Sequence, residues 1–146
     1  TVAITHRDPV SVIQSAATML AYGQRINRKR VDLQGLINYW TDRILHLLRA
    51  CVSDRAILPV AQSIDVPFHD FMADDLGMVE KIYARANLAM TAVARTQLQT
   101  YIDEHPRGKD GRVSYNLRYD FGVERAQLRE HFAFYFERFP VQVEVA

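Results

Sequence analysis

The sequence predicts a helix-rich α/β fold with a small parallel sheet, and three observations lead to this prediction. A short β-like run over residues 1–5 passes through an Asp-Pro pair directly into a stretch with helical apolar spacing. A second stretch keeps helical spacing for about twenty residues. The later extended segments are short and contain prolines, which are typical of strand ends and edges. Helices should therefore dominate the fold.

The first helix is expected over residues 9–24. Asp8 is a good N-cap, and Pro9 suits the first helical position because its missing N–H would have no partner within the helix. The apolar residues of one face recur at helical spacing: Val10, Ile13, Ala17 and Leu20. A basic connector over residues 25–30 follows, and we interpret it as a solvated link, although its four cations could also attract a nucleic acid, an acidic lipid surface or a glycan.

The second helix should begin after Asp32 and pack on the sheet or on the first helix. Its apolar positions follow the i, i+3, i+4, i+7 pattern: Leu33, Leu36, Ile37, Trp40, Ile44, Leu47, Leu48 and Cys51. Residues 57–60 and 63–68 are expected to be extended. Two further helices should be capped by Asp74 or Asp75 and by Thr91. A polar loop over 105–119 precedes a last, aromatic-rich helix over about 124–139.

Composition places the chain in a broad class. With 146 residues, 49% of them hydrophobic, residues 1–146 are expected to form a single domain. The net charge of +1 argues against a nucleic-acid partner. The single Cys51 allows no disulfide within the chain, and no apolar run approaches the roughly 18 residues of a membrane span. These features favour a cytoplasmic protein without a membrane span.

The junction between the first strand and the first helix has the chemistry of a phosphate site. Arg7 follows the strand at its carboxyl end, where ligands of open α/β sheets bind beside the next helix N-terminus. A guanidinium is a planar, permanently charged fork that suits phosphate oxygens. Ser11 and Ser15 share a helix face and either hydroxyl could add a donor. The alternative is a surface ion pair between Arg7 and a neighbouring carboxylate.

A second candidate site is the loop with Arg107, Lys109 and Arg112, which also contains Gly108 and Gly111. Glycine permits a backbone with positive φ, and turns with successive inward N–H groups bind anions. The alternative is a solvated basic loop. The histidines show no metal-ligand spacing, so no metal is expected, and no catalytic residue is assigned.

The segment from Val2 to Ser15 resembles the sulfotransferases that use 3′-phosphoadenosine 5′-phosphosulfate (PAPS), in which a strand ends in Arg-(Asp/Asn)-Pro and a Ser follows eight residues after the Arg. In that family these two residues hold the 3′-phosphate of the nucleotide. The resemblance therefore implies that Arg7 and Ser15 do so here.

Two later segments extend the resemblance over nearly the whole chain. Residues 66–79 are similar to the family's late strand and the helix after it, with Asp75 where the family often has Pro. Residues 106–115 and 119–123 look like the C-terminal loop of bacterial sulfotransferases, which closes over the nucleotide. This implies that Arg107, Lys109, Gly111 and Arg112 contact the nucleotide, with Arg112 favoured because the Gly-Arg-x-x-Tyr pattern is the better preserved part.

The family's other phosphate site, a P-loop-like strand, turn and helix near the amino terminus, has no counterpart in these residues, and the usual catalytic base lies upstream as well. The resemblance therefore implies the C-terminal portion of a P-loop-like sulfotransferase architecture, with the N-terminal half absent and this segment alone inactive. It also implies sulfuryl transfer from PAPS to a hydroxyl or amine of a small-molecule or glycolipid-like acceptor.

Further interpretations stay open. The chain could be a non-catalytic helical interaction module or nucleotide-binding module derived from the same fold, and exposed aromatics on the last helix would favour that reading. Its protein partner would be the missing N-terminal half or a second copy in a homo-oligomer. A P-loop kinase relative would need a Walker-type glycine loop, which the sequence does not contain.

Overall fold

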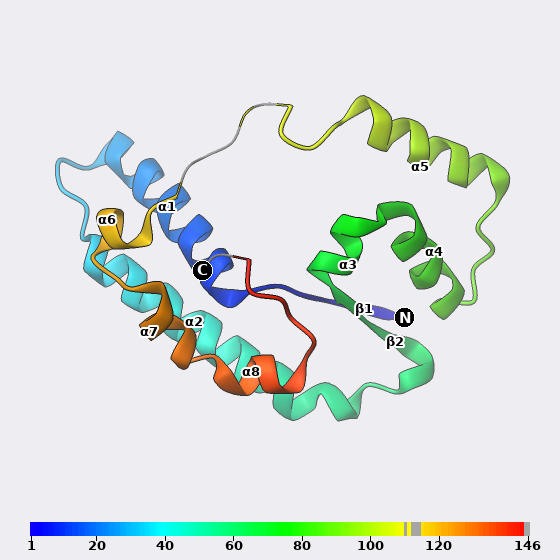
Figure 1. The fold of residues 1–146 in the computed structure, drawn as a ribbon, viewed down its shortest axis with the longest axis horizontal. Helices are drawn as coiled ribbons and strands as arrows, with labels where there is room; N and C mark the ends of the chain where they lie inside the picture. The colour runs from blue at the N-terminus through cyan, green and yellow to red at the C-terminus, as the bar shows by residue number, and fades with distance from the viewer. Residues whose placement is uncertain (110, 112–114, 145–146) are drawn as a thin grey trace. The chain divides into compact units, whose positions relative to one another are not determined.

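The computed structural model describes residues 1–109, 111 and 115–144. The chain forms two compact units, which are treated separately below. The first unit comprises Thr1–His6 and Ile57–Val113, and the second comprises Arg7–Ala56 and Ser114–Ala146. Figure 1 traces the elements of both units in chain order.

The first unit contains a two-stranded parallel sheet. Strand β1 (Val2–His6) pairs with strand β2 (Ser63–Pro67), and the register runs from Val2 opposite Ser63 to His6 opposite Pro67. The chain between the two strands runs through two long helices, as a parallel connection requires. The prediction of a small parallel sheet in a helix-dominated fold is confirmed.

Helices follow the second strand of this unit: α3 (Phe68–Ala73), α4 (Asp75–Arg85) and α5 (Ala92–Glu104). Asp74 caps α4 by accepting a hydrogen bond from the Gly77 N–H at 2.8 Å. Thr91 caps α5 in the same way, through the Ala94 N–H at 3.1 Å. Both predicted caps are confirmed. Helix α3, which begins directly after the proline that ends β2, was not expected from the sequence.

The expected extended segment over residues 57–60 is wrong. The chain there forms two short 3₁₀ helices, Arg55–Ile57 and Val60–Gln62, on either side of Pro59. Proline has no N–H to donate to a sheet, so a turn on each side of it satisfies the backbone better than a strand would.

The second unit begins with two long helices, α1 (Pro9–Asn27) and α2 (Leu33–Asp54). Each starts where predicted. The Asp8 side chain accepts from the Val10 N–H at 2.9 Å, and the Asp32 side chain accepts from the Gly35 N–H at 2.8 Å. Helix α1 continues three residues beyond the predicted end at Gln24.

The core of the second unit is built from α1, α2 and the C-terminal helices. Its buried members are Val10, Ile13, Ala17, Ala21, Ile37, Leu117, Phe121, Leu128 and Phe132. Of the predicted apolar stripe on α2, Ile37 is buried and several neighbours pack partly against the core, but Leu47 is 66% exposed. The amphipathic pattern therefore located the helix correctly and overestimated how much of its face is covered.

The C-terminal part of the unit comprises α6 (Leu117–Phe121), α7 (Arg125–Glu130) and α8 (Ala133–Arg138). The single last helix expected over 124–139 is wrong, because a turn at His131 and Phe132 divides it. At this turn the Phe132 N–H donates to the Arg129 carbonyl at 2.9 Å, a tighter bond than the i to i−4 bond of an α-helix. Histidine and aromatic residues have modest helix propensity, so interrupting the helix at His131 and Phe132 costs little free energy.

Candidate functional site

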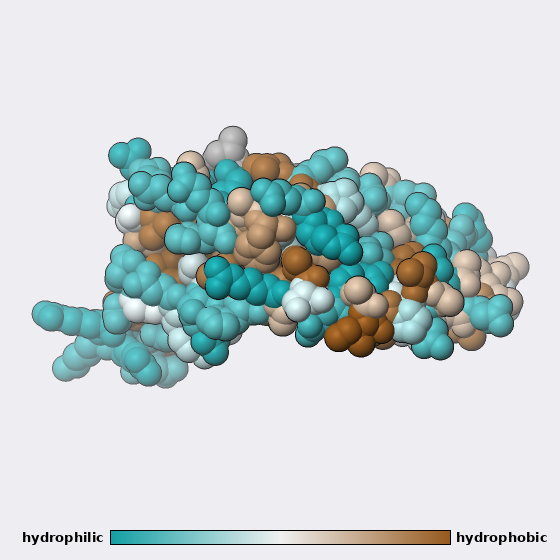
Figure 2. Space-filling model, turned by 90° about the horizontal axis from the view of Figure 1, so that it is seen from below, coloured by the Kyte–Doolittle hydropathy of each residue, from teal (hydrophilic) through white to brown (hydrophobic). Residues whose placement is uncertain are grey.

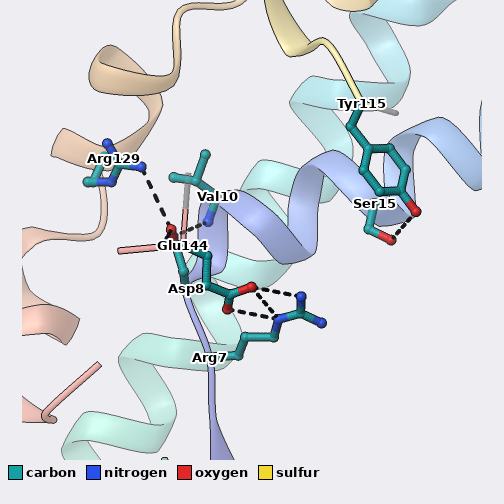
Figure 3. A network of polar contacts seen from close by, with 7 residues as sticks. All are labelled: Arg7, Asp8, Val10, Ser15, Tyr115, Arg129 and Glu144. Carbon is teal, nitrogen blue, oxygen red and sulfur yellow. Dashed lines mark hydrogen bonds and ion pairs between the residues drawn. The ribbon is translucent and has the colours of Figure 1, made fainter. Parts of the chain in front are cut away.

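The candidate phosphate site is organised around Asp8, the N-cap of α1. Its side chain is fully buried, and its Oδ1 accepts the Val10 N–H. Its Oδ2 accepts the backbone N–H of Glu144 at 3.1 Å and lies 3.7 Å from Arg129 Nη2. A buried carboxylate needs such donors, because burial otherwise disfavours its charge. The cap thus ties the start of α1 to the C-terminal segment (Figure 3).

Arg7, the residue before this cap, holds a carboxylate in a two-pronged contact. Its Nε donates to Glu144 Oε1 and Oε2 at 2.9 and 3.1 Å, and its Nη2 donates to Oε2 at 2.8 Å (Figure 3). The hydrogen bonds to Glu144 raise the pKa of Arg7 above its ordinary value, against a smaller opposing effect of burial. The ion pair considered for Arg7 in the sequence therefore forms, and the fork is turned toward an oxyanion.

Ser15 lies two turns along α1, and its hydroxyl is directed toward the Tyr115 hydroxyl at 3.4 Å (Figure 3). The distance is long for a bond between hydroxyls. Two other hydroxyls, of Ser11 and Thr18, lie at i−4 and i+3 from Ser15. Both are buried without a hydrogen-bond partner among the residues that the structure describes. One side of α1 therefore carries three weakly satisfied hydroxyls.

Tyr115 comes from the Gly-Arg-x-x-Tyr part of the basic loop, and the structure brings it to α1. Arg125 on α7 donates to the Tyr115 carbonyl at 3.4 Å and to Gln14 Oε1 on α1 at 3.2 Å. The Gln14 side chain is 97% buried by this packing, since its exposed fraction is 3%. Tyr115, Glu144 and Arg125 were not predicted as site residues. Of these three, only Tyr115 belongs to a motif that the sequence shows, the Gly-Arg-x-x-Tyr pattern.

The other candidate residues belong to the first unit. Arg107 forms an ion pair with Asp75 and donates to the Met72 carbonyl at 3.0 Å, so its guanidinium is held at the junction of α3 and α4. Lys109 is exposed. Gly111 has φ of +92°, and Gly108 has φ of +80°. Both glycines thus adopt the positive φ that glycine permits, whereas Arg112 lies outside the described residues.

A groove of about 770 Å³ runs beside this loop, between α4 and α5. Apolar side chains line most of it, among them Phe71, Val79 and Leu98, and the Arg107–Asp75 pair lies at its wall. Its volume lies within the range of small-molecule sites. The sequence analysis did not anticipate it.

His6, the last residue of β1, is buried. Its Nε2 lies 2.9 Å from Asp65 Oδ1 on the neighbouring strand. This contact makes His6 part of the packing at the end of the strand.

No group of three or more His, Cys, Asp or Glu side chains in the described part of the chain is arranged to hold a metal ion. Among the helices described, none combines the length and the apolar character needed to cross a bilayer.

The surface bears on the interaction-module interpretation. Among the aromatic residues of the last helical segment, Phe132, Tyr135 and Phe139 are at most 3% exposed, and Phe134 and Phe136 are half-buried against the core. The exposed aromatic face that would favour the module is therefore not found there. Apolar side chains do reach the surface elsewhere, in separate patches among polar ones (Figure 2). On α1 they include Met19 and Tyr22.

The fold is similar to that of solved structures over most of the chain. The fold matches the crystal structure of sulfotransferase STF9 from Mycobacterium avium with a TM-score of 0.82 and 20% identity, covering 97% of this chain and 36% of that one. It also matches sulfotransferase STF1 from Mycobacterium tuberculosis with a TM-score of 0.67 and 24% identity, covering 90% of this chain and 33% of that one. No curated protein sequence matches.

The chain thus spans about a third of the length of these solved structures, and at such identities the likeness shows a shared fold. Membership of a family is shown by the sequence itself. The model of the sulfotransferase family matches residues 1–92, which is more than half of the chain. The matched residues include the strand, Arg7, the Asp8 cap and Ser15. This chain belongs to the sulfotransferase family.

Proposed function

We propose that this chain supplies the part of a PAPS-dependent sulfotransferase that binds the 3′-phosphate of the donor nucleotide. One observation carries the proposal: Arg7, at the end of β1 and beside the capped start of α1, already holds a carboxylate through three hydrogen bonds. A fork that binds two carboxylate oxygens in this way is suited to two oxygens of a phosphate.

In the proposed site, Arg7 and Ser15 contact the 3′-phosphate, and Tyr115 brings the start of the following segment to the same helix. The basic loop with Arg107, Lys109, Gly111 and Arg112 closes over the nucleotide. Positive φ at Gly111 supports this role, because such turns point successive N–H groups in one direction.

The complete enzyme would move a sulfuryl group from PAPS to a hydroxyl or amine. The acceptor atom attacks sulfur in line, the bond from sulfur to the bridging phosphate oxygen breaks, and a base outside this chain takes the acceptor's proton. The residues proposed here hold the nucleotide and do not touch the bond that breaks, so they act by positioning and by charge. The acceptor is a small molecule or a glycolipid-like molecule.

Isothermal titration of this chain with 3′-phosphoadenosine 5′-phosphate and with adenosine 5′-phosphate tests the proposal. We expect the 3′-phosphorylated nucleotide to bind more tightly and the preference to fall about 10- to 100-fold in Arg7→Ala, since charge-assisted hydrogen bonds contribute about 1.5–3 kcal/mol.

Arg118→Ala is the matched control, because Arg118 also pairs with a glutamate of the second unit, Glu124 at 2.9 Å, but is 80% exposed at its side chain. It should leave both affinities unchanged. Equal affinities of wild type and Arg7→Ala for the 3′-phosphorylated nucleotide would refute the assignment. The interaction-module alternative predicts no preference between the two nucleotides in any variant.

A further inference from the structure

The Glu144 carboxylate occupies the fork that the proposed function assigns to the nucleotide's 3′-phosphate. It takes three hydrogen bonds from Arg7, two from Nε and one from Nη2. Each of these N–H groups can serve one strong acceptor well, so a phosphate bound to the same edge of the guanidinium must replace the carboxylate. The two anions therefore compete.

The competitor is tethered. The Glu144 N–H donates to the buried Asp8 carboxylate at 3.1 Å, which fixes the backbone of residue 144 beside the start of α1. A tethered group acts at a high effective concentration, in the millimolar range for short flexible links. A free monoanion at low concentration would not displace it easily, whereas a phosphate dianion brings more charge to Arg7.

The position of the pair permits exchange. The side chains of Arg7 and Glu144 are 44% and 24% exposed, so water can reach both after they separate. A half-exposed ion pair is weak compared with a buried one, which keeps the cost of opening it small.

We propose that Glu144 is a built-in competitor for Arg7 that sets the affinity and selectivity of the phosphate site. This inference rests on the proposed function. A nucleotide with a 3′-phosphate opens the pair and takes the Arg7 fork. A nucleotide with a free 3′-hydroxyl leaves the pair closed and gains nothing from Arg7. After transfer, return of Glu144 to Arg7 assists release of the bisphosphorylated product.

The test compares Glu144→Gln with the wild-type chain in titrations with 3′-phosphoadenosine 5′-phosphate and adenosine 5′-phosphate. Glutamine keeps the size of the side chain and removes its charge. We expect the affinity for the bisphosphate to rise about two- to tenfold, the range that corresponds to an exposed or half-exposed ion pair, and its dissociation to slow. The affinity for adenosine 5′-phosphate should stay unchanged.

Glu137→Gln is the matched control, because Glu137 is an exposed glutamate of the same unit and its neutralisation changes the net charge equally. It should change neither affinity. A second variant, Glu144→Asp, keeps the charge on a shorter side chain and should give an intermediate gain. Circular dichroism confirms that each variant is folded before titration.

Three results would overturn the inference: an unchanged bisphosphate affinity in Glu144→Gln, a weaker one, or an equal gain for both nucleotides in Glu144→Gln and Glu137→Gln. An unchanged affinity would mean that Glu144 does not compete with the phosphate. A weaker affinity would mean that Glu144 positions Arg7 for binding, and an equal gain in both variants would be a general effect of net charge. Failure of the proposed function is a separate result, because in that case Arg7→Ala itself leaves the bisphosphate affinity unchanged.

Discussion

The Asp8 carboxylate accepts the N–H of Glu144, 136 residues further along the chain, while its other oxygen caps α1 through Val10. One fully buried side chain thus fixes both the helix start and the C-terminal segment of the second unit. Arg7, adjacent in sequence, holds the side chain of the same Glu144. The geometry of the candidate site therefore depends on Asp8, although Asp8 itself is fully buried.

The first prediction follows from this double role. Asp8→Ala removes the cap of α1 and the acceptor of the Glu144 N–H, and it takes away a buried carboxylate 3.7 Å from Arg129, so it should lower the free energy of unfolding by about 2–4 kcal/mol. The matched variant is Asp32→Ala, which removes the exposed cap of the Gly35 N–H and should cost about 1 kcal/mol.

Urea unfolding followed by the fluorescence of Trp40 measures both, because Trp40 is the single tryptophan and lies on α2 of the same unit. An Asp8→Ala variant no less stable than Asp32→Ala would contradict the role of Asp8 in holding the C-terminal segment.

A second prediction separates the two serines of α1. Ser15→Ala should weaken binding of 3′-phosphoadenosine 5′-phosphate about tenfold and leave adenosine 5′-phosphate unaffected, because a hydrogen bond to a charged group contributes about 1.5 kcal/mol or more. Its long contact with Tyr115 is easily exchanged for a phosphate oxygen.

Ser11→Ala is the control, since the Ser11 hydroxyl is buried without a partner among the residues described. It should leave nucleotide affinity unchanged and the free energy of unfolding the same or slightly higher. A larger loss of bisphosphate affinity in Ser11→Ala than in Ser15→Ala would transfer the phosphate contact to Ser11.

Local chemistry made much of the fold predictable. The caps at Asp8, Asp32, Asp74 and Thr91 were all identifiable because each side chain bonds to N–H groups two or three residues ahead. The small size of the sheet was predictable for a similar reason, since prolines and short extended runs are local features. The positions of Arg7 and Ser15 on the strand end and helix face follow from the same spacing.

Long-range relationships were not predictable in this way. Nothing in the sequence near Arg7 indicates that Glu144 is its partner, because the pairing depends on the path of the C-terminal segment after α8. The contact of Tyr115 with Ser15 spans 100 residues and has the same origin. The turn at Phe132 is set by tertiary packing, which overrides the helical spacing of the aromatic residues around it.

The third prediction concerns pH. The hydrogen bond to Glu144 raises the pKa of Arg7 in the folded state. A group whose pKa is raised by folding stabilises the protein at every pH below its unfolded-state pKa. This stabilisation is lost only as the pH rises through the folded-state pKa. For Arg7 that loss lies far above neutral pH. Arg7 should therefore add no pH dependence to the free energy of unfolding between about pH 5 and pH 9, because its guanidinium stays charged throughout this range.

Bisphosphate binding, in contrast, should weaken as pH falls through about 6, where a phosphate monoester takes up its second proton. Titrations across the range check this, and the pH dependence should be smaller in Arg7→Ala, which has lost the charge that responds to the phosphate. A drop in wild-type affinity between pH 7 and pH 9 that Arg7→Ala lacks would show that Arg7 loses its proton in this range.

The last prediction contrasts two glycines of the second unit that differ in backbone conformation. Gly122 ends α6 in the left-handed region, with φ of +68°, and its N–H donates to the Arg118 carbonyl at 2.9 Å. Gly23 lies within α1, and a Cβ there would meet no atom within 4 Å.

Gly122→Ala should lower the free energy of unfolding by about 1–2 kcal/mol, because a side chain is strained at positive φ. Gly23→Ala should raise it by about 0.5–1 kcal/mol, because alanine loses less backbone freedom on forming a helix. Urea unfolding read through Trp40 measures both changes, and effects of the same sign would show that conformational preference at these two positions does not govern the stability of the unit.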